Sequence, residues 1–223
     1  MDKRVEDALK ASVQAFEKII EKANSNFLSD LIAAFESSEN YMQKVDLLDQ
    51  CFDDYPQYED LREVMFDLLL MNFFAADVEK LEEDYLESKE WEEIEEQTID
   101  RGTELLNLLL YLRECTDDDV EPELDDFLKE FLLVDEDEFQ DEYRIYEPMI
   151  ANQILIDSDY QEIQKVTNGL DEEQELVELF YPVMSFFAEK DPAPEQFNQF
   201  IKHSSNPAFD AAVYTLAIAY NQN

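Results

Sequence analysis

Glycine is almost missing from this chain, with two residues in 223. Tight hairpin turns, phosphate-binding loops and left-handed backbone turns all depend on glycine, so the sequence argues against hairpins and nucleotide loops. Glu, Leu, Ala and Gln, which favour helices, are abundant instead. We therefore predict an all-α protein of about 9–12 helices, arranged as a multi-helix bundle or an irregular array of helical hairpins.

Cysteines and long apolar runs are also scarce. The two cysteines, Cys51 and Cys115, are too few for a disulfide framework and are expected to be reduced core residues. The longest apolar candidate, 105–112, is far shorter than the roughly 18 residues of a membrane span, and the N-terminus lacks the apolar core of a signal peptide. These absences predict a soluble, cytoplasmic protein with no membrane partner.

Basic side chains are outnumbered to an unusual degree. The chain has 57 Asp and Glu against 16 Lys and Arg, a formal net charge of -41. Disorder is the weaker interpretation, because 45% of the residues are apolar and 13% are aromatic. Residues 51–150 alone hold 35 acidic and seven basic side chains, which accounts for 28 of the 41 net charges. The charge is therefore expected on the surface of folded helices rather than in an acidic tail.

Apolar residues recur at helical spacing along nearly the whole chain. We expect one domain spanning 1–223, with 1–116 and 117–223 as candidate helical subdomains. The segment 58–76 is apolar around most of its circumference and is predicted to be a central helix. The expected helices span about 2–23, 26–35, 40–54, 58–76, 77–96, 98–115, 122–134, 136–156, 159–168, 171–189, 194–203 and 207–221.

Local signals define several of these boundaries. Tyr55 precedes Pro56 and should end a helix, because the residue before proline resists helical geometry. Asn206 followed by Pro207 is a typical helix start. Asn168 followed by Gly169 predicts a helix that ends in a left-handed residue.

Two prolines, Pro148 and Pro182, fall inside helical patterns and lie 34 residues apart. At the same offset, apolar residues coincide, which is the spacing of a helical-hairpin repeat. The other interpretation is that amphipathic helices align by chance, since no third copy is evident. The C-terminal half is therefore only a candidate repeat. The coinciding pairs include Tyr146 with Phe180, Met149 with Val183 and Ile163 with Phe197.

A search for catalytic and metal-binding patterns finds none. Three acidic clusters resemble the start of a calcium loop, but each lacks glycine at the sixth position and glutamate at the twelfth. His203 is the only histidine and is interpreted as a helix C-terminal residue. We therefore predict no cofactor, no metal and no catalytic residues, and expect that the protein is not an enzyme.

The densest acids define a candidate partner-binding surface. On one continuous helix, glutamates three or four residues apart would form a stripe that lowers helix stability, because like charges at this spacing repel. Three explanations remain open: a solubilising face, a haloadapted surface, or a docking face for a cationic partner. The candidate docking residues are Glu79, Glu83, Glu87, Glu90, Glu93, Asp117, Asp118 and Asp119.

The leading hypothesis is an acidic protein-binding module that docks a basic partner, as an inhibitor or immunity-type protein that mimics nucleic acid would do. Direct binding to nucleic acid is not expected, because phosphate contacts need a basic patch. One alternative is a helical-repeat scaffold or chaperone that holds a peptide in an apolar groove. Another is an enzyme with no recognisable motif. The sequence does not define an oligomeric state.

Overall fold

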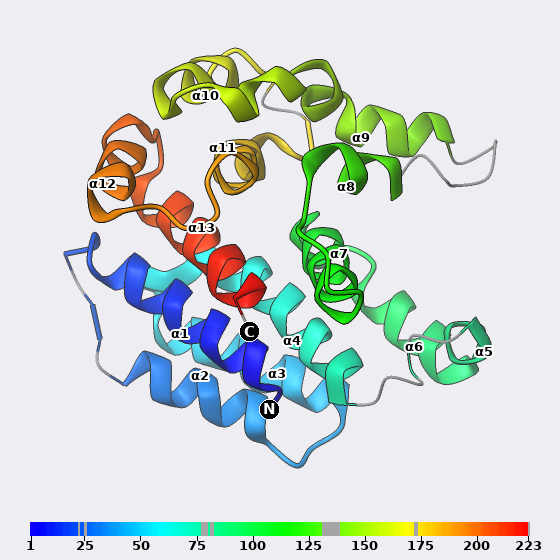
Figure 1. Ribbon diagram of the computed structural model, residues 1–223. Coiled ribbons are helices and arrows are strands. Elements are labelled where there is room, and N and C mark those ends of the chain that lie inside the picture. The colour runs from blue at the N-terminus through cyan, green and yellow to red at the C-terminus, as the bar shows by residue number, and fades with distance from the viewer. Residues whose placement is uncertain are drawn as a thin grey trace.

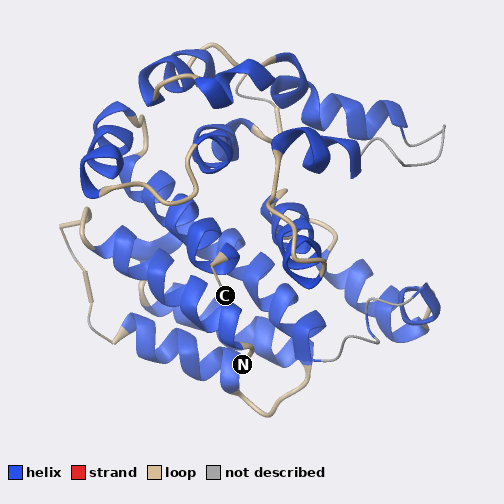
Figure 2. Cartoon of the chain, viewed as in Figure 1, coloured by secondary structure: helices blue, strands red, loops and turns tan. Residues whose placement is uncertain are grey.

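The computed structural model describes residues 1–21, 23, 24, 26–76, 80, 83–130, 139–171 and 174–222, without the side chains of residues 83 and 139–142. Within these residues the chain forms thirteen α-helices, short 3₁₀ helices and no strand, which confirms the all-α class (Figure 1; Figure 2). The helices are α1 (Lys3–Glu17), α2 (Phe27–Glu36), α3 (Tyr41–Asp54), η1 (Pro56–Leu61), α4 (Arg62–Ala76), α5 (Glu83–Leu86), α6 (Lys89–Thr98), α7 (Leu105–Asp117), α8 (Leu124–Glu130), α9 (Phe139–Ala151), η3 (Gln153–Asp157), α10 (Tyr160–Thr167), α11 (Val177–Ala188), α12 (Pro194–His203) and α13 (Pro207–Asn221).

Local capping residues begin and end many of these helices. The Asn40 side chain accepts from the backbone N–H of Gln43, and the Gln43 side chain accepts from the N–H of Asn40, so that α3 starts with a capping box. The same helix ends at Asp54, before Pro56, as predicted. Helices α12 and α13 each begin with proline and match their expected bounds.

The first and last long helices, α1 and α13, lie side by side (Figure 1). Small buried residues on both helices, among them Ala8 and Ser12 on α1 and Ala211 on α13, allow the backbones to approach closely. The Thr215 hydroxyl donates to the carbonyl oxygen of Ala11 at 3.3 Å. This pairing joins the two ends of the chain in the middle of the molecule.

Helix α4 is the central helix that the sequence predicts. Nine consecutive residues, 64–72, are buried, which requires packing on every side. Helices α1, α3 and α7 contact it, and α7 also contacts α13. The helix begins at Arg62 rather than Tyr58, because Pro56 starts the separate 3₁₀ turn η1.

Helices α9, α10 and α12 form an arc, and α11 lies inside it, between α10 and α13 (Figure 1). Helix α11 contacts α9, α10 and α13, and α12 contacts α10 and α13, so that both neighbouring and alternate helices pack together. Pro148 and Pro182 both lie inside helices, in α9 and α11. Tyr146 and Phe180, which coincide at the 34-residue offset, are both buried.

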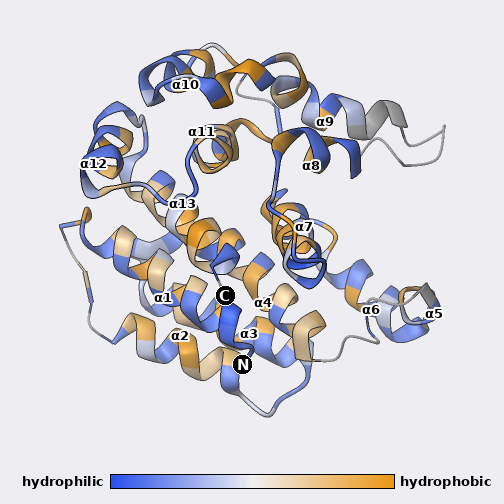
Figure 3. Ribbon diagram, in the orientation of Figure 1, coloured by the Kyte–Doolittle hydropathy of each residue, from blue (hydrophilic) through white to orange (hydrophobic). Residues whose placement is uncertain are grey.

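Buried apolar residues from α1 to α13 form one hydrophobic cluster, and Figure 3 shows apolar residues on the inward-facing parts of the helices. Both cysteines are free and buried, as expected. Among the described residues, no helix combines the length and the apolar character that crossing a membrane requires.

Several local expectations are wrong. Helix α1 ends at Glu17 rather than near residue 23, and α7 begins at Leu105 rather than near residue 98, because the chain turns at Gly102. Gly169 does not adopt a left-handed conformation, and α10 ends with Asn168 still in helical geometry. Among the described residues, positive φ angles occur at Gly102 and Asp119. The acidic stripe predicted along one helix is also interrupted. Helix α5 ends at Leu86, and Ser88 begins α6 by accepting from the N–H of Trp91. The N-cap serine therefore interrupts the helix predicted over 77–96, of which residues 77–79, 81 and 82 lie outside the described residues.

Candidate functional site

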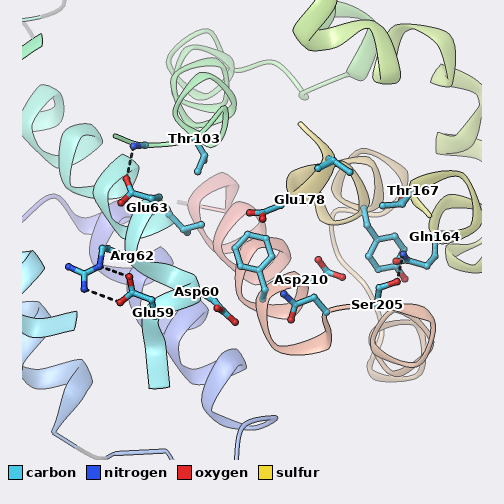
Figure 4. Close-up of a pocket in the computed structure, with 16 residues that line it drawn as sticks. Glu59, Asp60, Arg62, Glu63, Thr103, Gln164, Thr167, Glu178, Ser205 and Asp210 are labelled. Carbon is cyan, nitrogen blue, oxygen red and sulfur yellow. Dashed lines mark hydrogen bonds and ion pairs between the residues drawn. The ribbon is translucent and has the colours of Figure 1, made fainter. Parts of the chain in front are cut away.

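A cleft of about 580 Å³ opens between the N-terminal helices and the C-terminal arc (Figure 4). We call it the interhelical cleft. Its walls come from η1, α4, the α6–α7 connection, α10, α11 and the start of α13, so that residues about 150 positions apart face one space. The lining residues are Glu59, Asp60, Arg62, Glu63, Val64, Gly102, Thr103, Gln164, Thr167, Val177, Glu178, Tyr181, Ser205, Asn206, Phe209 and Asp210.

Arg62 is the one cation among the described lining residues, and carboxylates hold it. Its guanidinium donates to Glu59 at 2.9 Å, to Asp53 at 2.8 Å and to Asp49 at 3.1 Å. Only 18% of its side chain is exposed. Its charge is therefore already balanced on the α3–α4 side of the cleft.

Arg101, just behind the rim, is engaged in the same way. It donates to both oxygens of Asp49 and both oxygens of Glu63 at 3.0 Å. Glu63 Oε2 also accepts from the N–H of Gly102 at 2.7 Å. This bidentate network holds the α6–α7 connection against α3 and α4.

Asp67 lies beneath this connection and is 1% exposed. It accepts from the backbone N–H of Thr103 at 3.0 Å and from its hydroxyl at 2.5 Å. Burial raises the pKa of this carboxyl well above its usual range, although the Thr103 hydrogen bonds oppose that shift. The chain passes over Asp67 only because Gly102 has φ +85° and no side chain; a Cβ there would lie 2.5 Å from Asp67 Oδ1.

Asp210, in the first turn of α13, forms part of the opposite wall. The Ser204 hydroxyl donates to it at 2.5 Å, and the side chain is 5% exposed. Burial raises the pKa of Asp210 to about 7, and the Ser204 hydrogen bond only partly offsets the effect. A carboxyl of this kind exchanges its proton near neutral pH.

Gln164 belongs to the α10 wall and is 5% exposed. Its Nε2 donates to Ser205 Oγ at 2.9 Å and to Asn168 Oδ1 at 3.0 Å. Within the described residues, its buried carbonyl oxygen Oε1 has no hydrogen-bond donor. A buried acceptor without a donor costs about 1–3 kcal/mol, and because this atom is closed to solvent, no group in the cleft contacts it unless neighbouring side chains move.

The charge of the cleft is not balanced within the described chain. Glu59 and Glu63 are paired with Arg62 and Arg101. Asp60 and Glu178 are exposed, and neither has an ion-pair or hydrogen-bond partner among the described side chains. Figure 4 shows Asp60, Glu178 and Asp210 around the same space. The unbalanced carboxylates make the cleft attractive to a cation.

The docking residues predicted from sequence lie elsewhere. Glu90 and Glu93 are exposed on α6 and line a separate hollow with Lys44 and Lys80. Glu87 is exposed between α5 and α6. Glu79 lies outside the described residues, and Glu83 begins α5 but its side chain is not described.

The three aspartates at the end of α7, Asp117–Asp119, form another exposed group. Asp117 lies 3.9 Å from both Arg113 and Arg4 and remains 64% exposed. Asp118 and Asp119 are exposed, and Asp118 lines a hollow beside α8. None of these residues lines the interhelical cleft. The structure therefore places Glu90 and Glu93 in one hollow and Asp118 in a different one.

Sequence reasoning missed the cleft residues. The burial of two acids could have been predicted from their neighbours. Asp67 is the one polar residue between Val64 and Met71, and Asp210 lies between Phe209 and Ala211. An acid in such a run is expected to be buried and therefore shifted in pKa. Asp60 and Glu178 carry no such signal, because nothing local distinguishes them from other exposed acids.

In the described part of the chain, no three His, Cys, Asp or Glu side chains are arranged to hold a metal ion. Comparison with protein-family models, curated proteins and solved structures found no match to this chain.

Proposed function

We propose that this protein is an acidic helical module that docks a basic protein partner. The observation that carries the proposal is the imbalance of charge on ordered helices. None of the five glutamates of α6 has an ion-pair partner among the described residues, and the same holds for Asp60 and Glu178 in the cleft. A basic partner would supply the missing counter-charge.

The cations of the chain do not neutralise these acids, because most of the described Lys and Arg side chains already interact with other groups. Arg62 and Arg101 are held in the carboxylate network, and Lys129 pairs with Asp125 and Asp126 on its own helix. Lys80 lies over the Phe73 ring with its Nζ 3.5 Å from the centroid. The excess charge is thus available to an external partner rather than neutralised internally.

The sharpest form of the proposal is an inhibitor or immunity-type protein that occupies the phosphate-binding surface of a nucleic-acid-binding protein. Fixed carboxylates on rigid helices would replace the phosphates of the nucleic acid. Glu87 before α6, Glu90 and Glu93 on α6, and Asp117–Asp119 at the end of α7 stay candidate contacts in this complex. Two buried, free cysteines support placing it in the reducing cytoplasm.

The test is a pull-down at low salt with stepwise salt elution, followed by reassembly of the complex from the purified protein and the eluted partner. We expect one basic protein that binds with defined stoichiometry and dissociates steeply as salt rises, since screening weakens charge-driven binding. Retention of no basic protein at low salt would sink the proposal. A reassembled complex that is insensitive to salt would do the same.

A second candidate is a helical scaffold that binds a peptide in an apolar groove. It is favoured by the stacking of α9 on α11 and of α11 on α13, with a proline inside both α9 and α11. Its complex would resist salt, and replacing the glutamates of α6 by glutamine would leave its affinity unchanged.

A third candidate is an enzyme that uses Asp210 for proton transfer, because a carboxyl in a cleft with a pKa of about 7 suits general acid–base chemistry. This candidate predicts hydrolysis of some member of an ester, phosphate and glycoside panel, with loss of that activity on Asp210→Asn. Docking of a basic partner predicts no turnover.

A further inference from the structure

We propose that a hollow bounded by α3, α4 and α6, the α4–α6 hollow, binds a lysine ammonium of the basic partner. The bound ammonium would take the place where the ammonium of the chain's own Lys80 now lies. This inference rests on the proposed function and adds where the partner binds and through which side chain. Two observations meet in the hollow: an ammonium seated on an aromatic ring, and carboxylates without a described counter-charge.

Aromatic rings form the cation-binding part of the α4–α6 hollow. Lys80 Nζ lies 3.5 Å from the centroid of the Phe73 ring and 5.7 Å from that of the Tyr85 ring. Tyr41 lines the same hollow, with its ring centroid 4.8 Å from that of Phe73. The face of an aromatic ring is negative and attracts a cation within about 6 Å. The chain's own side chain therefore identifies the ligand that this place accepts, a primary ammonium.

Lys80 lies on the ring although carboxylates are close at hand. Glu90 and Glu93 line the same hollow, yet Lys80 forms no ion pair with a described carboxylate. The ammonium of Lys129, by contrast, pairs with two aspartates of its own helix. A lysine stem is flexible enough to reach several positions, so the position of Lys80 means that the ring face competes well with carboxylates for an ammonium.

The α4–α6 hollow also has room and charge for a cation from outside the chain. Its volume is about 410 Å³. Glu39, Glu90 and Glu93 line it, are exposed, and have no ion-pair partner among the described residues. These carboxylates would attract a basic partner and could receive the Lys80 ammonium once it leaves the ring.

Lys80 is the cation that a partner would displace. Lys44, the other cation among the described lining residues, donates to the carbonyl oxygen of Phe35 at 2.9 Å and is held there. Lys80 is half-buried and makes no hydrogen bond or ion pair with a described residue. Removing Lys80 should therefore strengthen binding of an external ammonium, whereas removing the Phe73 ring should weaken it.

The experiment titrates N-acetyl-lysine N-methylamide (capped lysine) into the protein at about 150 mM NaCl and follows binding by NMR. Capped norleucine, which has a similar apolar stem but no ammonium, is the ligand control. The variants are Lys80→Ala and Phe73→Leu. Their matched controls are Lys89→Ala, at an exposed lysine of α6, and Phe73→Tyr, which keeps an aromatic ring. Circular dichroism checks that each variant folds.

In the wild-type protein the ε-methylene protons of Lys80 should resonate upfield of those of other lysines, because the Phe73 ring current shields them. They should move downfield as capped lysine displaces the side chain, and stay in place with capped norleucine. Lys80→Ala should bind capped lysine about fivefold more tightly and Phe73→Leu about fivefold more weakly, as expected for one cation–π contact. Lys89→Ala and Phe73→Tyr should stay within about twofold of wild type.

Equal responses to capped lysine and capped norleucine would overturn the ammonium site. So would affinities that change in the same direction in Lys80→Ala and Phe73→Leu, or Lys80 signals that do not respond to capped lysine. Each of these results leaves the docking proposal standing, because the salt-elution pull-down tests that proposal with the partner itself.

Discussion

Asp210 shows how the fold changes the chemistry of a single residue. Burial disfavours the charged carboxylate of Asp210 and raises its pKa from the ordinary 3.8 to about 7. The unfolded chain releases this proton at lower pH than the folded protein. Between about pH 4 and pH 7 the folded state therefore binds more protons, and this residue makes stability fall as pH rises.

Asp210→Asn should remove this pH dependence, because asparagine keeps an oxygen that accepts from Ser204 but carries no charge. We expect the stability gained by the substitution to be about 2 kcal/mol larger at pH 8 than at pH 5.5. Urea unfolding at the two pH values measures this difference. Asp118→Asn at an exposed position is the control and should show a much smaller change. An equal gain from Asp210→Asn at both pH values would contradict the buried-carboxylate argument.

Gly102 is the second residue whose role the structure defines. Gly102→Ala should destabilise the protein by about 2–4 kcal/mol, because alanine resists φ +85° and its Cβ would meet Asp67 Oδ1. Gly169→Ala is the matched control, since Gly169 has no positive φ and its added Cβ would lie 3.3 Å from Val166 O. It should cost less than about 1 kcal/mol. Urea unfolding measures the loss of stability in each variant. Similar losses would show that the backbone at Gly102 does not need glycine to pass over Asp67.

At the scale of the element, two asparagines occupy helix N-cap positions with different hydrogen bonding. Asn40 caps α3 through its side chain, whereas Asn26 precedes α2 without a side-chain cap bond. Asn40→Ala should therefore cost about 1 kcal/mol and Asn26→Ala only a few tenths. Chemical denaturation of the two variants gives the comparison, and a cost at Asn26 as large as that at Asn40 would rule out the capping-box explanation.

The break between α5 and α6 is the element-scale feature that most affects the acidic surface. Ser88 begins a new helix, so Glu87 and Glu90 belong to different segments. Like-charge repulsion along one helix is therefore lower than the sequence spacing alone indicates.

For the whole molecule, the net charge of -41 should make stability depend on salt. The melting temperature should rise by several degrees between about 20 mM and about 500 mM NaCl, because salt screens repulsion between acids that no internal cation balances. Differential scanning calorimetry measures the rise. The Glu92→Gln, Glu95→Gln variant should melt higher than wild type at low salt and respond less to salt. A melting temperature that does not change with salt would mean that the acids are too widely spread to repel one another.

Sequence alone determined the features that depend on neighbours along the chain. Helix α13 begins where Asn206 and Pro207 predict it, and α4 is central because its apolar residues surround it. These follow from backbone hydrogen bonding and helical periodicity, which act over a few residues. Burial of Asp67 and Asp210 was also accessible from their apolar neighbours.

Only the tertiary structure decided where the cleft lies and which acids remain without counter-charge. Asp60 and Glu178 are 118 positions apart and line the same cleft because η1, α11 and α13 border one space. The Gln164 amide nitrogen donates to Ser205, 41 positions away, while its buried oxygen has no donor among the described residues. The strong negative charge is therefore a property of the sequence, whereas its convergence on a cleft comes from long-range packing that no local pattern encodes.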